Sequence, residues 1–386
     1  MAPFDATRLR RSPHLVCYWS DRDFLIHNYA TGVRVVGQPV TWDILNFFDE
    51  WRAAGALFKE RPAWNPSHLR RLLTAFVRHS LLQRADRPLP GSEQAMIGWQ
   101  SWNPAAGFFH TATKDVPFDD LDSTVRVLRR HGRTRPMPSP VKRYPRSRVF
   151  KLPAVAAAGE FPDVLLSRRT WRRFGPNPVD ISALSTVLGL TAGIQRWAHA
   201  SGEGTIALKT SPSGGARHAI ELYVVALNVK GLRRGIYHYA ADVHALERLS
   251  DARPNSTIVS RYLPVQAWYA EASALVFFSA VFPREVWRYG YARAYRAVLI
   301  EAGHLCQTFC LAATWQHLAP FCTMALADSR IEQDLELDGI SESVLYAAGV
   351  GMPPNDAAAP RRTAKPGMLT KREVQQFPGR IVRKRR

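Results

Sequence analysis

The chain has 386 residues, of which 46% are hydrophobic, 22% charged and 11% aromatic. This composition is typical of two or three globular domains, and it excludes a chain that is disordered as a whole. No uncharged apolar run reaches about 18 residues and residues 1–16 lack the apolar stretch of a signal peptide, so we expect no membrane span and no secretion.

The charge balance is strongly basic: 52 Lys and Arg stand against 32 Asp and Glu, a formal net charge of +20. Such a surface favours anionic partners, namely phosphates, nucleic acid, anionic lipid or an acidic peptide, without choosing among them. The four cysteines are too few for a disulfide scaffold. We therefore expect a reducing, cytoplasmic compartment.

Residues 15–90 carry the pattern of a hairpin followed by two helices. A strand is expected at Phe24–Tyr29, with a turn at Gly32 and a return strand over 33–36. Thr41 is the expected N-cap of a first helix, and Asn65 followed by proline signals a second. This order predicts a small winged-helix module.

Residues 91–160 are rich in aromatic residues without a clear period, and residues 131–153 carry several prolines among arginines. We expect an irregular entry segment and an extended linker. Residues 161–365 alternate helices and strands, with helices expected after Asp180 and over 291–318. Strands are expected over 220–229 and 274–282, and over 344–350 near the end, with a hairpin from 235 to 249. Residues 366–386 are expected to form a basic tail.

Three constellations in the third region could carry chemistry. Arg168, Arg169, Thr170 and Arg172 could hold a phosphate through bidentate hydrogen bonds; the alternative is a solvated basic turn. A strand follows the next constellation, Ser213-Gly214-Gly215, so it is not a P-loop. Its glycines would let a ligand approach backbone amides closely, unless this is a plain turn.

The last constellation contains Arg288 and Tyr289, and it leads to His304 on the long expected helix. Tyr and His can transfer protons, although a lone core histidine is more often structural. Cys306 and Cys310 lie four residues apart on the same face of that helix, and His304 and Cys322 are nearby, so we consider zinc. Because structural zinc sites typically use cysteine knuckles on turns, we expect no metal.

Taken in order, these motifs resemble the SagB-type dehydrogenases, a branch of the FMN-dependent nitroreductase-like oxidoreductases. The resemblance covers residues 99–365. It implies an α+β fold with a mixed sheet flanked by helices, and a homodimer with FMN at the subunit interface. It also implies oxidation of thiazolines or oxazolines in a modified peptide.

The resemblance also implies roles for individual residues. The FMN phosphate and ribityl chain would contact Arg168, Arg169, Thr170 and Arg172, with Arg361 or Arg362 completing the phosphate site. The isoalloxazine edge would meet Ser213, Gly214 and Gly215, and backbone amides of Met324 and Ala325 would lie near the ring. These roles agree with what a flavin needs from a protein, which is orientation and electrostatics.

One departure concerns the catalytic pair. Azoline-oxidising members carry Lys-Tyr where this chain has Arg288-Tyr289, and arginine cannot act as a base because it stays protonated. Tyr289 could still relay a proton. Azole formation is therefore less strongly indicated than flavin redox chemistry.

The N-terminal module resembles the precursor-recognition domains of peptide-modifying enzymes, which add a leader peptide as a strand. We favour peptide over DNA there, since fold alone does not fix function. The expected function is hydride transfer from a peptide C–H to FMN. Cyclases that modify the same peptide are further candidate partners. The alternatives are an NAD(P)H-dependent enzyme on small aromatics and an inactive peptide-binding scaffold.

Overall fold

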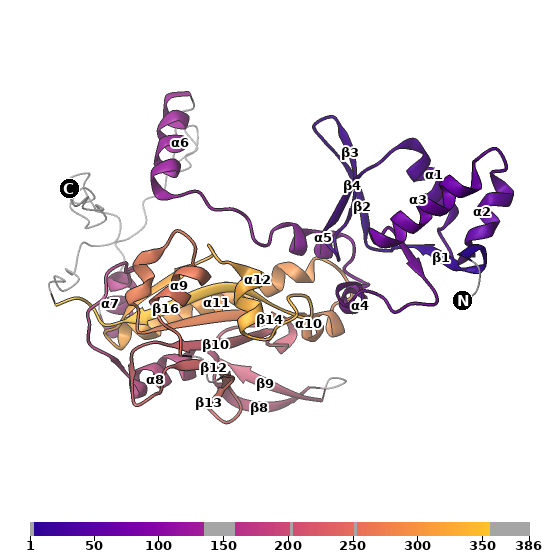
Figure 1. The fold of residues 1–386 in the computed structure, drawn as a ribbon. Coiled ribbons are helices and arrows are strands. Elements are labelled where there is room, and N and C mark those ends of the chain that lie inside the picture. The colour runs from indigo at the N-terminus through magenta and orange to yellow at the C-terminus, as the bar shows by residue number, and fades with distance from the viewer. Residues whose placement is uncertain (1–3, 135–158, 201–203, 251–252, 356–386) are drawn as a thin grey trace, which may run out of the picture.

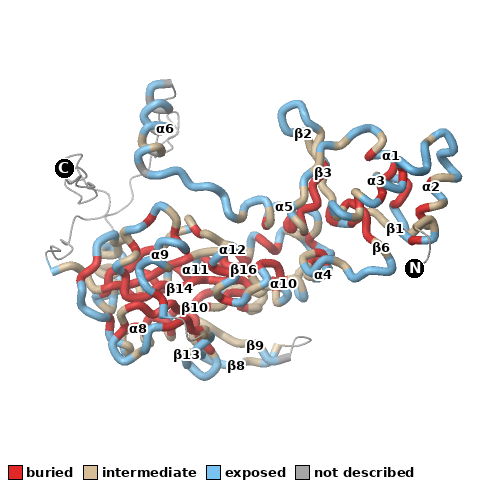
Figure 2. The backbone as a smooth tube through the Cα atoms, viewed as in Figure 1, coloured by how far each residue is buried: buried red, intermediate tan, exposed pale blue. Residues whose placement is uncertain are grey.

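The computed structural model describes residues 4–134, 159–200, 204–250 and 253–355. Figure 1 shows a smaller lobe formed by the N-terminal elements and a larger lobe built around a sheet. Figure 2 shows buried backbone in both lobes, and the more extensive core in the larger one. The helix α6 (Leu121–Thr134) stands away from both.

The smaller lobe combines two small antiparallel sheets with three α-helices and one short 3-10 helix. One sheet has the order β5-β1-β6 and the other β2-β3-β4. The strands are β1 (Arg8–Arg11), β2 (Leu15–Ser20), β3 (Asp23–Asn28), β4 (Val33–Val36), β5 (Arg52–Ala53) and β6 (Leu82–Arg84). The helices are η1 (Phe4–Ala6), α1 (Pro39–Phe47), α2 (Ala54–Glu60) and α3 (Pro66–Arg78).

The expected hairpin and both helices of this lobe are present. β3 pairs with β4 in the register Leu25↔Val36. Asn65 caps α3, because its side chain accepts from the backbone N–H groups of Ser67 at 2.9 Å and His68 at 3.1 Å. The short elements β1, β2, β5, β6 and α2 were not predicted.

The predicted N-cap of α1 is wrong. The cap residue is Gln38, and Thr41 lies within the helix at its third position. The Thr41 hydroxyl accepts from the Gln38 backbone N–H at 3.1 Å. Thr41 therefore takes part in the capping box from the third position of the helix and is not itself the cap residue. The apolar residues of α1 then pack with Leu9, Ile26 and Leu73 in the core of the lobe.

Residues 91–112 form short helices, where the sequence predicted an irregular segment. They are α4 (Gly91–Met96), η2 (Ile97–Trp99) and α5 (Ala105–Ala112). The indole N–H of Trp99 donates to the Ile340 carbonyl at 3.1 Å, and that of Trp102 to the Tyr289 carbonyl at 2.8 Å. These aromatic residues lack a helical period because their partners lie far away in the chain. Most of the expected linker, residues 135–158, lies outside the described residues.

The centre of the larger lobe is a six-stranded sheet of order β13-β12-β10-β14-β16-β15. All five pairings in this sheet are antiparallel, and the one parallel pairing among the described strands joins β7 to β11. The strands of this lobe are β7 (Val179–Asp180), β8 (Ile194–Ala200), β9 (Gly204–Lys209), β10 (Ile220–Ala226), β11 (Val229–Lys230), β12 (Gly235–Ala240), β13 (Ala245–Arg248), β14 (Ala274–Val281), β15 (Ala319–Thr323) and β16 (Glu342–Gly351).

Helices cover both faces of this sheet. Its helices are α7 (Glu160–Ser167), α8 (Ile181–Ala192), η3 (Gly214–Ala216), α9 (Ser256–Tyr262), η4 (Ala267–Glu271), α10 (Phe282–Arg288), α11 (Ala294–Trp315) and α12 (Asp328–Asp334). The core on one face includes α8 and α11, and that on the other includes α9, η4 and α12. β14 is buried from Ala274 to Ala280 because it has helices on both sides.

The α+β class expected from the sequence is confirmed, and so are the main elements of the third region. The mixed sheet that the resemblance implied is wrong for the described strands, since the six-stranded sheet is antiparallel. Asp180 caps α8 by accepting from the Ser182 N–H at 2.9 Å. The expected hairpin is β12–β13. The expected long helix is α11, which begins three residues later and ends three residues earlier than the pattern indicated.

Among the described residues, α11 alone has the length and hydropathy of a membrane-spanning helix. It packs against the sheet through residues such as Val298, Leu305 and Phe309, each at most 2% exposed. This is the arrangement of a core helix, as the sequence predicted.

Candidate functional site

The loop between β9 and β10 lies against the end of α10. Gly215 has φ +55°, a conformation that favours glycine. A Cβ placed on Gly215 would lie 2.3 Å from Nε of Arg288 and 2.8 Å from the hydroxyl of Tyr289. The fold thus brings together the glycine loop and the Arg288-Tyr289 pair, which are more than 70 residues apart in the chain.

Ser213 fixes this loop to α11. Its hydroxyl donates to the Glu301 carboxylate at 2.5 Å and accepts from the His218 backbone N–H at 2.8 Å. The other Glu301 oxygen accepts from the Ile220 N–H at 3.3 Å. Burial raises the pKa of Glu301, while the bonds from Ser213 and Ile220 oppose that rise. Ser213 therefore has a positioning role in addition to the flavin contact that the sequence predicted for it.

Glu285, on α10, was missed by the sequence analysis. Its side chain is fully buried, and neither carboxylate oxygen has a hydrogen-bond partner. One oxygen would lie 3.1 Å from a Cβ on Gly214, so the carboxyl group sits directly behind the glycine loop. Burial raises the pKa of Glu285 to about 7, and the nearby Glu301 contributes to the rise. A buried carboxyl with such a pKa can hold or release a proton near neutral pH.

Cations surround the same loop. Arg284 pairs with Glu221 at 2.5 Å and donates to the His218 carbonyl at 2.7 Å. Burial lowers the pKa of Lys209, and burial together with the charge of Lys209 lowers the pKa of His218 to about 4. His218 is therefore neutral near pH 7, and the fixed positive charge comes from the arginines and Lys209.

The arginine-rich segment runs along the opposite end of α11, beside β15. It begins at Arg168, directly after α7, and the Trp171 N–H donates to the Pro320 carbonyl at 3.0 Å. Met324 and Ala325 follow β15 immediately, and β15 is an edge strand, so the fold brings both predicted cofactor-binding segments to one edge of the sheet.

The individual groups at this edge differ in what they contact. The Arg169 guanidinium donates to the carbonyls of Leu166 and Arg168 at 2.9 and 2.7 Å. Met324 is 72% exposed, whereas the Ala325 N–H already donates to the Thr323 hydroxyl at 3.1 Å. The amide of Ala325 is therefore engaged within the chain.

Among the described residues, the predicted site residues form two separate groups. Ser213, Gly214 and Gly215 lie with Arg288 and Tyr289 near the first half of α11. A second group contains Arg168, Arg169, Thr170, Arg172, Met324 and Ala325. Arg361 and Arg362 lie outside the described residues.

His304 lies between these groups and contacts the glycine loop. Its Nδ1 is 3.3 Å from the Pro212 carbonyl, but its side chain is exposed on α11, so it is not the core histidine that the sequence analysis considered.

One comparison with known proteins concerns this same stretch. Residues 165–352 match the model of the Nitroreductase family, so this part of the chain is a nitroreductase family domain. It contains both groups of site residues described above.

Two curated proteins match a part of the chain of similar length. A Methanocaldococcus jannaschii protein described as a nitroreductase is 29% identical over 175 residues, which are 45% of this chain and 83% of that protein. The trifolitoxin-processing protein TfxB of Rhizobium leguminosarum bv. trifolii is 30% identical over 176 residues. That match covers 45% of this chain and 47% of TfxB, so the chain spans less than half of TfxB.

A solved structure of the E. coli microcin synthetase McbBCD complex, with truncated pro-MccB17 bound, is also similar. It has 18% identity and a TM-score of 0.40, and the match covers 69% of this chain and 98% of that chain.

Proposed function

We propose that this protein is an FMN-dependent oxidoreductase that dehydrogenates a peptide during the biosynthesis of a ribosomal peptide natural product. The observation that carries the proposal is the meeting of Tyr289, Arg288 and the Gly215 loop within a nitroreductase family domain. The similarity to a trifolitoxin-processing protein supports a peptide as the substrate.

The residues present fit a flavin. Glu285, Arg288 and Tyr289 already occupy the space beside the glycine Cα atoms, so a flat ring would meet the Ser213-Gly214-Gly215 segment through its backbone, with Arg284 close by. Arg168, Thr170 and Arg172 would bind the phosphate. Arg169 is the weaker phosphate ligand, because its guanidinium donates to main-chain carbonyls. Bound FMN would supply the acceptor for a hydride leaving a substrate C–H next to nitrogen.

The chain's own residues would handle the proton that leaves with that hydride. The Tyr289 hydroxyl is the group at the loop that can pass a proton onward. Arg288 lies with its guanidinium carbon 5.4 Å from the Tyr289 ring centre and stays protonated, so it orients Tyr289 and does not act as a base. Glu285, which lies behind the same loop and has a pKa of about 7, could accept that proton.

The smaller lobe would hold the leader segment of the substrate, in the manner of a winged-helix recognition module. A peptide strand could extend the β2-β3-β4 sheet. A groove of about 260 Å³ beside α3, lined partly by Trp64, His68 and Leu72, offers apolar contacts on the same lobe. The proposal also includes a homodimer, partner cyclases and a cytoplasmic location.

The test uses the purified full chain and a synthetic leader peptide carrying one thiazoline. The expected product is lighter by two hydrogen atoms in mass spectrometry. Tyr289→Phe should reduce the rate by about 100-fold or more, in the range of general acid–base catalysis. Tyr291→Phe is the matched control, since its exposed ring lies 5.9 Å from Tyr289 and should tolerate the change. If Tyr289→Phe oxidised the peptide as fast as Tyr291→Phe, the proposed role of Tyr289 in proton transfer would be contradicted.

A second candidate is an NAD(P)H-dependent nitroreductase acting on small aromatics. The match to most of the M. jannaschii protein favours it. It predicts that NADPH reduces the flavin rapidly without any peptide and that a nitroaromatic reoxidises it. Slow reduction by NADPH together with turnover of the thiazoline peptide would exclude this candidate.

A further inference from the structure

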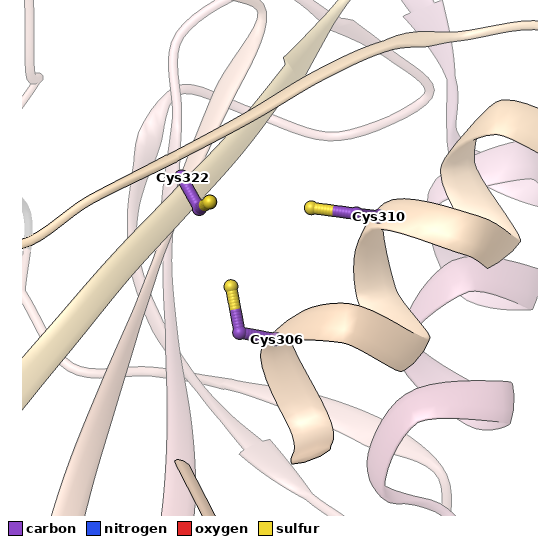
Figure 3. Close-up of side chains that lie close together, drawn as sticks. All are labelled: Cys306, Cys310 and Cys322. Carbon is purple, nitrogen blue, oxygen red and sulfur yellow. The ribbon is translucent and has the colours of Figure 1, made fainter. Parts of the chain in front are cut away.

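Three of the four cysteines lie together between α11 and β15. Cys306 and Cys310 are one turn apart on α11, and Cys322 faces them from β15. Their three sulfur atoms all lie within 4.8 Å of one another. Figure 3 shows the three side chains directed into one common space.

The surroundings of these sulfurs are mainly apolar. Cys306 and Cys310 are 2% and 3% exposed, and both belong to the core that α11 forms with the sheet. One polar group also contacts the cluster: the Tyr346 hydroxyl on β16 donates to the Cys322 sulfur at 3.3 Å.

Three converging thiols are a ligand set for a soft metal ion, because thiolate selects zinc, copper(I) and similar ions over hard cations. Charge distinguishes among these ions, since a net charge buried in an apolar core is costly. Three thiolates carry one net negative charge with a divalent ion and two with a monovalent ion, so burial in the apolar core favours the divalent ion.

We propose that Cys306, Cys310 and Cys322 bind one divalent thiophilic metal ion, zinc being the biological candidate. Three protein ligands leave the fourth position of a tetrahedral zinc for water or another small donor. Tyr346 supports Cys322 from the outer shell. The sequence analysis considered zinc at these cysteines and expected no metal, because they form no knuckle on a turn. That Cys322 of the strand meets Cys306 and Cys310 of the helix is shown only by the fold.

The principal alternative is a disulfide. Cys306 and Cys310 cannot form one without backbone movement, since positions four apart on a helix have Cβ atoms about 5–6 Å apart. Cys322 could pair with either of them. Mass spectrometry of the unreduced protein tests this alternative directly, and a disulfide at Cys322 would overturn the proposal.

The test is a titration of the fully reduced full chain with cadmium(II), followed by competition with zinc(II). Binding should give sulfur-to-cadmium absorption in the ultraviolet that saturates at one ion per chain, with the intensity of three thiolates. Because this readout uses the wild-type protein, it does not depend on the folding of any variant. Absence of the absorption, or an intensity of one thiolate, would overturn the proposal.

Variants then assign the ligands. Cys322→Ser should weaken cadmium binding by more than about 100-fold, and Tyr346→Phe by about 10-fold, the low end for an outer-shell partner. Cys17→Ser is the matched control, because Cys17 is exposed on β2 in the other lobe. It should bind as the wild type does. Unchanged binding in folded Cys322→Ser would refute the assignment.

Discussion

Replacing Glu285 by glutamine should change how the stability of the protein depends on pH. The carboxyl is fully buried without a hydrogen-bond partner, and burial raises its pKa from 4.5 to about 7. A raised carboxyl pKa means that the folded state holds the proton more tightly than the unfolded state. The contribution of Glu285 to stability is therefore complete below about pH 4.5, and it is lost as the pH rises towards and through 7.

The size of the effect follows from the two pKa values. A pKa shift of one unit corresponds to about 1.4 kcal/mol, so the shift of the Glu285 pKa from 4.5 to about 7 corresponds to about 3 kcal/mol. Glu285→Gln keeps the shape of the side chain but cannot ionise. The unfolding free energy of the variant minus that of the wild type should therefore be about 3 kcal/mol larger at pH 8 than at pH 4.5, because only the wild type loses stability when Glu285 ionises.

The assay is urea unfolding, followed by tryptophan fluorescence, of both proteins at several pH values between 4.5 and 8. Only the difference between the curves is interpreted, because other titrating groups then cancel. Glu271→Gln, at an exposed glutamate, is the control and should follow the wild type at every pH. If wild type and Glu285→Gln also stayed parallel across this range, the buried carboxyl would not be neutral below pH 7 and the reasoning would be refuted.

Three further predictions concern the same loop. Ser213→Ala removes the bonds to Glu301 and to the His218 N–H, and should lower the free energy of unfolding by about 1–3 kcal/mol in a denaturant titration. Gly215→Ala places a Cβ 2.3 Å from Arg288 in a left-handed conformation, and should reduce the FMN content measured by absorbance. Tyr289→Phe should retain FMN while losing turnover, so a colourless Tyr289→Phe protein would argue for a binding role instead.

Local signals in the sequence predicted much of the fold. The amphipathic stripe after Asn65, the cap at Asp180 and the long apolar helix each depend on residues close together in the chain. The glycine loop and the Arg288-Tyr289 pair were chosen as separate motifs, and the structure places them in contact.

Features that depend on distant contacts were not predicted. Trp99 and Trp102 bond to carbonyls 241 and 187 residues away, so the segment that carries them shows no periodic pattern. Glu285 is a single glutamate in a seven-residue helix, and only its burial distinguishes it from a surface residue. Cys322 joins Cys306 and Cys310 through the pairing of a strand with a helix, which spacing alone cannot reveal.

The central claim is that the chain carries FMN, and the visible absorption spectrum of the purified full-length protein tests it most directly. The account predicts flavin absorption bands, and release of the cofactor should yield FMN in a ratio near one per chain. A featureless spectrum that does not change when FMN is added would contradict the claim.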